Sequence, residues 1–288
     1  MKSIGIYYFS GTGNTALVAN TIKETLVNLG YAVDLFRIED ILKNHLPIDF
    51  SRYDFVGIGS QVIGYGTPNL VLDFIGRLPR SEGQKVFIFR TAGGVAPINY
   101  NASKPMIQRL TRKGYDVVYE RLFSISSNWI VRFEDAVIRE LVAATQRKAA
   151  IMCHEVIRGE RRYLKTGLGQ QVLMETAAFF SRWFFRLVGQ DYRVGPSCAK
   201  CGLCVRNCPT GNIYEQNGKI KFKLSCASCL RCVYSCPQQA LQLNIFKSFT
   251  VAGGYNIKQI LSNQAASIEK PSGKVPRFFE EYLVNDTL

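Results

Sequence analysis

A repeated cysteine pattern in the last third of the chain constrains its fold most strongly. Eight of the nine cysteines lie in two runs of the form Cys-x2-Cys-x2-Cys-x3-Cys-Pro, displaced by 28 residues. The first run holds Cys198, Cys201, Cys204 and Cys208, and the second holds Cys226, Cys229, Cys232 and Cys236. In this pattern three thiolates of one run surround a cubane 4Fe-4S cluster, and the fourth binds the cluster of the other run. The repeat therefore predicts two 4Fe-4S clusters.

Crossed ligation follows from the same pattern. We expect one ligand set to be Cys198, Cys201, Cys204 and Cys236, and the other to be Cys208, Cys226, Cys229 and Cys232. Zinc does not suit this spacing, since a zinc site takes four ligands, commonly as two separated Cys-x2-Cys pairs. Disulfide frameworks are typical of short secreted chains, whereas this chain has 288 residues. The apolar run at its start is too short for a signal peptide, so we expect a cytoplasmic, reducing location.

The charge of the chain indicates an acidic partner. Lys and Arg number 36 against 22 Asp and Glu, a formal net charge of +14. Two oxidised clusters with their thiolates lower this to about +10, so the loaded protein stays basic. Basic surfaces attract acidic proteins, nucleic acid or anionic lipid. No nucleic-acid motif accompanies the charge, and we therefore expect an acidic redox partner.

The first half of the sequence alternates apolar strands with helical stretches, as in a parallel sheet with helices on both faces. Strands are predicted at Ile4–Phe9, Ala32–Arg37, Phe55–Ser60, Val86–Thr91 and Tyr115–Leu122. Helices are predicted near 15–29, 69–78 and 103–113. Such a doubly wound α/β domain binds ligands at the carboxyl ends of its strands. The loops after the first, third and fourth strands are therefore the expected site.

Four segments are predicted along the chain. They are an α/β domain at 1–133, a helical linker at 134–190, a small α+β domain with the cysteines at 191–245, and a tail at 246–288. The ninth cysteine, Cys153, is expected to be a buried helix thiol. The tail is expected to pack on the body through Phe278, Phe279 and Tyr282.

The second helix of the linker has an apolar stripe. Leu173, Ala177, Phe180, Phe184 and Leu187 lie on one side, with Glu175, Arg182 and Arg186 opposite and Trp183 on the flank. Such a stripe usually faces a protein core, and we expect this helix to pack on the two domains. The alternative is a peripheral membrane helix at 170–188, assisted by the basic cluster Arg158, Arg161, Arg162 and Lys165.

A glycine- and hydroxyl-rich loop follows the first strand and opens a helix. Its expected phosphate-binding residues are Ser10, Thr12, Gly13, Asn14 and Thr15. Free N–H groups at a helix N-terminus bind phosphate, and the hydroxyls add donors. No lysine of a nucleotide-triphosphate P-loop is present. Gly11, Gly13 and Ala16 also fit a relaxed dinucleotide fingerprint with Glu39 or Asp40 as the ribose acid, but the hydroxyl density favours a mononucleotide.

The segment Ser10 to Thr15 after a strand, followed by Ala19, resembles the flavodoxin phosphate-binding signature. The resemblance implies a sheet of order 2-1-3-4-5, and FMN with its ring between two loops. The implied ring-binding residues are Gln61, Gly64, Tyr65, Gly66, Thr91, Ala92, Gly93 and Gly94. Tyr65 is the candidate for stacking, with Asn99, Tyr100 and Trp129 as further candidates, and Arg90 either faces the reduced flavin or is solvated.

Residues 1 to about 245 resemble the flavodoxin-ferredoxin fusion family of anaerobic bacteria. The resemblance implies an oxidoreductase-type protein that transfers electrons between two 4Fe-4S clusters and FMN, and delivers them to a redox partner. The alternative is a self-contained reductase of a small electrophile such as a quinone or an unsaturated compound. A third function is a cluster-bearing scaffold or sensor at the membrane. The sequence offers no catalytic acid-base pair near the expected flavin loops.

Overall fold

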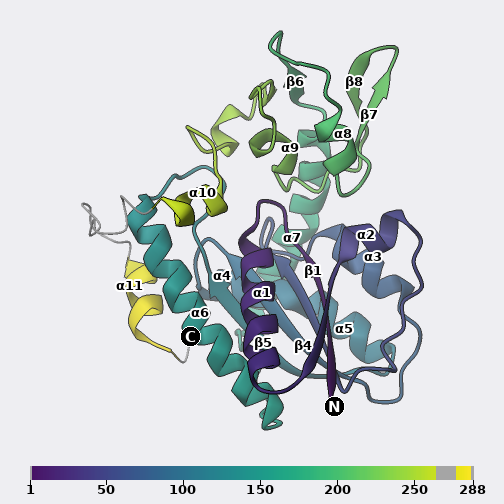
Figure 1. Cartoon of the computed structure of the whole chain (residues 1–288), viewed down its shortest axis with the longest axis vertical. Helices are drawn as coiled ribbons and strands as arrows, with labels where there is room; N and C mark the ends of the chain where they lie inside the picture. Colours follow the sequence, from purple (N-terminus) through teal and green to yellow (C-terminus); the bar gives the residue numbers. More distant parts are fainter. Residues whose placement is uncertain (1, 264–276, 287–288) are drawn as a thin grey trace.

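The computed structural model describes residues 2–263 and 277–286. Figure 1 shows a parallel sheet flanked by helices, with a smaller region above the upper ends of its strands. The chain passes from the sheet to this smaller region through the long helix α7 (Leu168–Val188). We call the smaller region, residues 191–245, the cysteine-rich region because it contains the eight repeated cysteines.

The sheet has five parallel strands in the order β2-β1-β3-β4-β5. Its strands are β1 (Ser3–Phe9), β2 (Ala32–Arg37), β3 (Phe55–Gln61), β4 (Lys85–Ala92) and β5 (Asp116–Ser124). Helices bury both faces of the central strands, which explains why these strands are nearly continuous apolar runs. This is the flavodoxin-like order of a doubly wound sheet. The predicted fold class and its five strands are confirmed.

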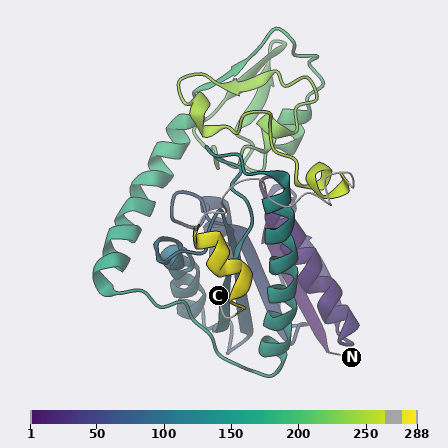
Figure 2. The same ribbon diagram turned by 90° about the vertical axis from the view of Figure 1, so that its left-hand side faces the viewer.

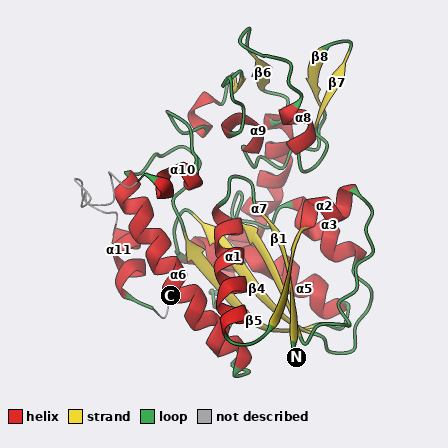
Figure 3. Ribbon diagram, in the orientation of Figure 1, coloured by secondary structure: helices red, strands yellow, loops and turns green. Residues whose placement is uncertain are grey.

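Two layers of helices cover the sheet. On one face lie α1 (Asn14–Asn28) and α6 (Asp135–Ile157). On the other lie α2 (Ile38–Lys43), α3 (Asn69–Arg77) and α5 (Lys104–Arg112). The short helices α4 (Pro97–Tyr100) and η1 (Asn101–Ser103) precede α5. Because the strands are parallel, their carboxyl ends meet at one edge, and Figure 3 shows this edge beneath the cysteine-rich region.

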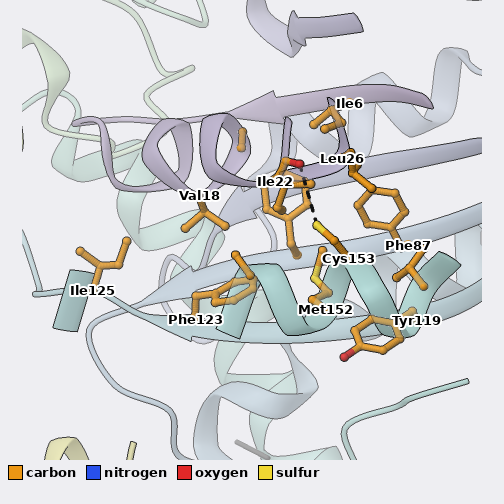
Figure 4. Close-up of a cluster of buried hydrophobic side chains, with 14 of the residues drawn as sticks. Ile6, Val18, Ile22, Leu26, Phe87, Tyr119, Phe123, Ile125, Met152 and Cys153 are labelled. Carbon is orange, nitrogen blue, oxygen red and sulfur yellow. Dashed lines mark hydrogen bonds between the residues drawn. The ribbon is translucent and has the colours of Figure 1, made fainter. Parts of the chain in front are cut away.

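Helix α6 belongs to the core of the sheet domain, although residues 134–190 were expected to form a linker. Figure 4 shows Met152 and Cys153 of α6 facing Val18 and Ile22 of α1. The Cys153 thiol donates to the carbonyl of Ile22 at 3.8 Å, and burial raises its pKa to about 12. Cys153 is therefore a buried helix thiol, as expected. The sequence pattern shows that α6 is a helix but does not show what it packs on.

Helix α7 packs on the domain through a narrow side, and the prediction for its apolar stripe is wrong. Leu173, Phe180 and Leu187 of that stripe are 62%, 64% and 54% exposed. The buried residues are instead Met174 and Ala178 in the middle of the helix and Val188 at its end. Because α7 carries apolar side chains around most of its circumference, the amphipathic pattern selected the wrong face.

The cysteine-rich region is built from two similar halves. Strand β6 (Tyr192–Val194) pairs with β9 (Leu241–Leu243), and β7 (Ile213–Gln216) pairs with β8 (Lys219–Phe222), both antiparallel. Its short helices α8 (Leu203–Asn207) and α9 (Arg231–Tyr234) lie in contact. Tyr192, Leu230, Leu241 and Leu243 form a small core with Val188 of α7. These elements agree with the predicted small α+β domain.

The tail returns to the sheet domain. After η2 (Lys247–Phe249), α10 (Ile257–Ser262) packs against α6. Helix α11 (Arg277–Val284) lies beside α6, as Figure 2 shows in yellow. Phe279 and Tyr282 are fully buried, and the Tyr282 hydroxyl lies 2.9 Å from that of Thr145. The expected packing of the tail through these two residues is observed. The side chain of Phe278 lies outside the described part of the chain.

Replacing Phe279 by alanine tests how much the tail contributes to stability. The substitution should lower the free energy of unfolding by about 3–5 kcal/mol, as for other buried aromatic residues. Val284→Ala is the matched control on α11, because Val284 is 84% exposed and should change stability by less than about 0.5 kcal/mol. Urea unfolding followed by far-UV circular dichroism measures both. Equal, small effects would show that the tail is not docked in solution.

Candidate functional site

The eight repeated cysteines line two separate cavities in the cysteine-rich region. Cys198, Cys201, Cys204 and Cys236 line one cavity, which we call the outer cage. Cys208, Cys226, Cys229 and Cys232 line the other, which we call the inner cage. Each cage therefore takes three cysteines from one run and the fourth from the other. The structure brings together the two sets that crossed ligation requires.

The two cages differ in their exposure. Cys201 of the outer cage is exposed to solvent, whereas Cys208 and Cys229 of the inner cage are buried. Burial, reinforced by the neighbouring Cys229, raises the pKa of the Cys226 thiol to about 12. Four thiolates crowded in such a site need a positive core to be stable, and metal coordination deprotonates thiols outright. The donor set thus fits a cationic iron-sulfur core.

The cages do not have the geometry of single-ion sites. Within residues 2–263 and 277–286, no three Cys, His, Asp or Glu side chains converge on one ion position. A cubane distributes its iron atoms over four corners, so its thiolates surround a cage and need not meet at one point. The arrangement of the cysteines therefore agrees with clusters of several irons.

The predicted phosphate loop forms the N-terminus of α1. Gly13 precedes the helix with φ of 107°, a left-handed conformation that favours glycine. Among the described residues, no side chain caps the helix and its first turn has no acidic residue. The Ser10 hydroxyl accepts from the N–H of Gly13 at 3.2 Å, which folds the loop on itself. Because no described side chain caps the helix, the backbone N–H groups of its first turn can bind an anion.

The loop side chains take different roles. The Thr15 and Thr91 hydroxyls lie 2.8 Å apart, joining the first turn of α1 to the end of β4. Thr12 accepts from the Asn128 amide at 2.8 Å. The Asn14 amide donates to the Ser126 carbonyl at 3.0 Å, and its oxygen accepts from Tyr255. Asn14 therefore anchors the loop to its surroundings, a role that its sequence context did not indicate.

A cavity of about 490 Å³ lies at the carboxyl ends of the strands, and we call it the strand-end cavity. Of the residues predicted for the phosphate loop and ring, those that line it are Ser10, Thr12, Asn14, Thr15, Gln61, Gly64, Tyr65, Thr91, Ala92 and Gly93. Gly13, Gly66 and Gly94 lie outside the lining, and Gly66 and Gly94 offer their carbonyls to Arg90 and Asn99. Asn99 and Trp129 also line the cavity, whereas Tyr100 does not.

Apart from Trp129, the other lining residues on the loop after β5 and on α7 were not among the sequence candidates. The loop after β5 contributes Ser126, Ser127, Asn128, Trp129 and Ile130, and α7 contributes Ser181, Phe184 and Phe185. The serine-rich run after β5 could have been predicted to line the cavity, because all parallel strands end at the same edge of the sheet. The approach of α7 and of the cysteine-rich region to this edge depends on tertiary packing and left no such signal.

Gly64 shows why the loop after β3 needs glycine. Its φ is 52°, and a Cβ there would lie 2.5 Å from the Phe185 ring and 2.6 Å from the Cβ of Ser181. The absence of a side chain at Gly64 therefore allows α7 to close one side of the cavity. Tyr65, also with positive φ, stays 41% exposed at the cavity mouth.

Arg90 takes neither of the two positions expected for it. It is fully buried, outside the lining of the strand-end cavity, and donates to the carbonyls of Ser60, Gln61, Gly66 and Ala102 and to the Thr67 hydroxyl. Burial lowers its pKa to about 9. Arg90 thus fixes the backbone of the loop after β3 from behind. A buried guanidinium satisfied by carbonyls could not be distinguished in sequence from a solvated one.

The inner cage touches the phosphate loop directly. A Cβ on Gly11 would lie 2.6 Å from the Cys229 carbonyl oxygen and 3.0 Å from its Cβ. Arg231, two residues further on, donates to the carbonyls of Gly11 and Ser10 and forms an ion pair with Glu39 at 2.5 Å. Cys229 consequently lines both the inner cage and the strand-end cavity.

The ion pair also bears on the dinucleotide alternative. Glu39, the candidate ribose acid, is buried and bound by Arg37 and Arg231. Asp40 lies 3.6 Å from Arg37. Neither carboxylate lines the strand-end cavity. The arrangement therefore favours a mononucleotide, as the hydroxyl density of the loop had indicated.

The described lining of the cavity suits a phosphate joined to a planar polar ring. It contains no Asp, Glu, Lys, Arg or His, so an anion would be held by N–H and hydroxyl groups alone. Oε1 of Gln61 is buried in the lining and has no hydrogen-bond partner among the described residues. An orphaned acceptor of this kind fits the N–H edge of a flavin ring. The residues present therefore fit FMN.

Comparison with known proteins supports the assignment of the cysteine-rich region. Residues 197–243 match a family described as a 4Fe-4S dicluster domain. This segment therefore binds two 4Fe-4S clusters. No curated protein matches the chain.

Solved flavodoxins are similar to the sheet domain. Flavodoxin 1 from Bacillus cereus is 20% identical and matches 55% of this chain and 98% of its own, with a TM-score of 0.40. Flavodoxin 2 from Bacillus cereus is 23% identical over 54% of this chain and 99% of its own, with a TM-score of 0.39. General stress protein 14 from Treponema denticola, solved with FMN, is 10% identical. The match covers 54% of this chain and 99% of that protein, with a TM-score of 0.40.

The strand order defines the first domain, and the family match defines the second. The chain therefore joins a flavodoxin-like domain to a 4Fe-4S dicluster domain, the architecture of flavodoxin-ferredoxin fusion proteins.

Proposed function

We propose that the chain transfers electrons between its two 4Fe-4S clusters and an FMN, and delivers them to an acidic redox partner in the cytoplasm. The observation that carries the proposal is the position of Cys229, which lines both the inner cage and the strand-end cavity. When bound, FMN holds one or two electrons and so links one-electron clusters to pair transfer.

The protein's own residues would hold and shield the flavin. Backbone N–H groups at the start of α1 and the loop hydroxyls would bind the phosphate. Oε1 of Gln61 would accept from the ring. Trp129 lies 5.1 Å from the Phe185 ring and 5.2 Å from the Phe249 ring, and these three residues of the lining would exclude water from one side.

The neutral lining favours electron transfer over the reductase alternative. A reductase that protonates its substrate uses a positioned acid, most often His, Glu, Asp, Lys or Tyr. Among the described lining residues, only Tyr65 at the mouth and the cluster ligand Cys229 carry a group of that kind. Electron transfer needs no such acid.

A basic surface beside the outer cage supports an acidic partner. Lys200 is exposed next to the exposed Cys201, and Lys219 and Lys221 flank Ile220, which lines the outer cage. Arg231, also in the cysteine-rich region, faces inward to Glu39 and lies outside this surface. The outer cluster would therefore exchange electrons with the partner, and the inner cluster with the flavin.

Removing single ligands tests this order of clusters. Cys208→Ala should abolish the inner cluster although Cys208 belongs to the first run, with a loss of roughly four of eight irons. Flavin reduction through the clusters should stop while the outer cluster still accepts an electron. Cys236→Ala is the matched control and should remove the outer cluster only. Iron analysis and EPR of the reduced variants would contradict crossed ligation if each variant lost the cluster of its own run.

The contact between Gly11 and Cys229 can be tested by adding one methyl group. Gly11→Ala should force the phosphate loop away from the inner cage, at a cost in stability of about 1–3 kcal/mol, typical of overpacking. Transfer from the clusters to the flavin should slow. Gly76→Ala is the control, because a Cβ there meets no atom within 4 Å. If Gly11→Ala transferred electrons to the flavin as fast as wild type, the contact would not be the transfer route.

Salt dependence separates a carrier from a self-contained reductase. Oxidation of the reduced protein by an acidic acceptor protein should slow steeply with salt, since the Debye length falls from about 10 Å at 0.1 M to about 3 Å at 1 M. The double variant Lys200→Glu, Lys219→Glu should show the same loss of oxidation rate with the acidic acceptor, already at low salt. Stopped-flow measurements with a small neutral quinone serve as the comparison. Equal, salt-insensitive rates with both acceptors would favour the reductase.

A further inference from the structure

The exposed side of α7 is the largest apolar feature that electron transfer does not explain. It consists of residues that are between 38% and 81% exposed, namely Leu168, Val172, Leu173, Phe179, Phe180, Trp183, Phe184 and Leu187. At about 100° per residue these side chains cover an arc of about 160°. Thr176 is the single polar residue in the interior of this arc, and Arg186 lies at its boundary beside Leu168. We call this set the α7 stripe.

Most of the stripe is exposed to solvent, while Phe184 and Phe179 also line cavities against the sheet domain. Figure 2 shows α7 at the left edge of the molecule, with one side turned outward along its whole length. The apolar surface continues beyond the helix, because the Phe184 ring lies 5.3 Å from that of Phe246, next to the exposed Ile245. Large contiguous apolar patches on a protein surface usually mark an interaction site.

Basic groups border the stripe. Arg182 and Arg186 lie at one edge of the arc, and no carboxylate pairs with them among the described residues. Arg109 and Arg112 line the adjoining groove with Arg182. Residues 158–188 contain six basic and two acidic residues. Arg158 and Arg161 of this set are paired with Glu160 and Asp116, and Glu175 is paired with Lys104.

We propose that the α7 stripe binds the surface of an anionic lipid bilayer, with the helix lying in the plane of the interface. A face of Trp, Phe and Leu bordered by arginine is the pattern of interfacial helices. No described helix is long and apolar enough to cross a membrane. Arg182 and Arg186 at the border have no carboxylate partner among the described residues, so anionic headgroups complement their charge.

Docking of this kind would orient the flavin site. Phe184 belongs to the stripe and also lines the strand-end cavity. Ile130, at 60% exposure, lies in the same lining and borders the cavity mouth with Tyr65. The mouth of the cavity therefore opens beside the surface that would meet the bilayer.

Vesicle flotation tests the proposal with the full chain carrying its clusters. Wild type should float with vesicles of phosphatidylglycerol and phosphatidylcholine, and at least tenfold less with phosphatidylcholine alone. The variant Leu173→Gln, Phe180→Gln, Trp183→Gln should lose more than tenfold of the binding. The control Val27→Gln, Leu46→Gln, Val284→Gln changes three exposed apolar residues elsewhere and should float like wild type. Arg182→Gln with Arg186→Gln should weaken binding about fivefold for each charge removed.

Several results would overturn the proposal. The proposal would be wrong if the wild-type protein did not float with anionic vesicles. It would also be wrong if the control variant lost as much vesicle binding as the stripe variant. A wild-type dimer in sedimentation equilibrium that the stripe variant converts to monomer would assign the stripe to self-association instead. A wild-type dimer would be assigned to the stripe only from this comparison.

Iron content and circular dichroism report on the folding of each variant. Because the arginine variant alters no apolar residue, it provides a second test if the stripe variant misfolds. Electron transfer from clusters to flavin in solution should be unchanged in the stripe variant, which keeps this test separate from that of the proposed function.

Discussion

The contact of Arg231 with the phosphate loop fixes how the two domains of this chain work together. Its guanidinium binds the carbonyls of Ser10 and Gly11 and the carboxylate of Glu39. The side chains of Glu39 and Arg231 are only 1% and 13% exposed, so the ion pair is largely withdrawn from water. Removing one partner of a buried pair commonly costs about 3–5 kcal/mol. The inner cage is therefore held against the strand-end cavity by an interaction that is costly to break.

Two glycines make this close approach possible, and they do so at different sides of the cavity. Gly11 lets the backbone of Cys229 reach the phosphate loop, and Gly64 lets Phe185 and Ser181 of α7 reach the loop after β3. A flavodoxin-like sheet alone would leave this edge open to solvent. Here the cysteine-rich region and α7 cover it, which replaces water with aromatic and neutral polar groups near the flavin position. Fewer exposed faces also mean fewer routes for electrons to escape to solvent species.

Sequence reasoning recovered what depends on local pattern. The strands are continuous apolar runs and the cysteines have a fixed spacing, so the sheet and both ligand sets could be stated before the structure. Features that depend on packing between distant segments could not. Arg90 looks the same in sequence whether solvated or buried, and its buried position depends on carbonyls from Ser60 to Ala102. The face of α7 was misassigned for a related reason, since both of its sides are apolar and only tertiary contacts select Met174 and Ala178 for burial.

The arrangement gives the proposed electron path two ends on different surfaces. One end is the outer cage, where Cys201 is exposed beside Lys200, a surface suited to a transient acidic protein. The other is the mouth of the strand-end cavity, where Tyr65 and Ile130 lie close to the apolar residues of α7. Binding at the first surface depends on electrostatic attraction, which weakens as the salt concentration rises. Binding at the second depends mainly on burial of apolar area. A chain docked through α7 would therefore keep its outer cage free to meet a soluble partner, because the two surfaces use different residues and different forces.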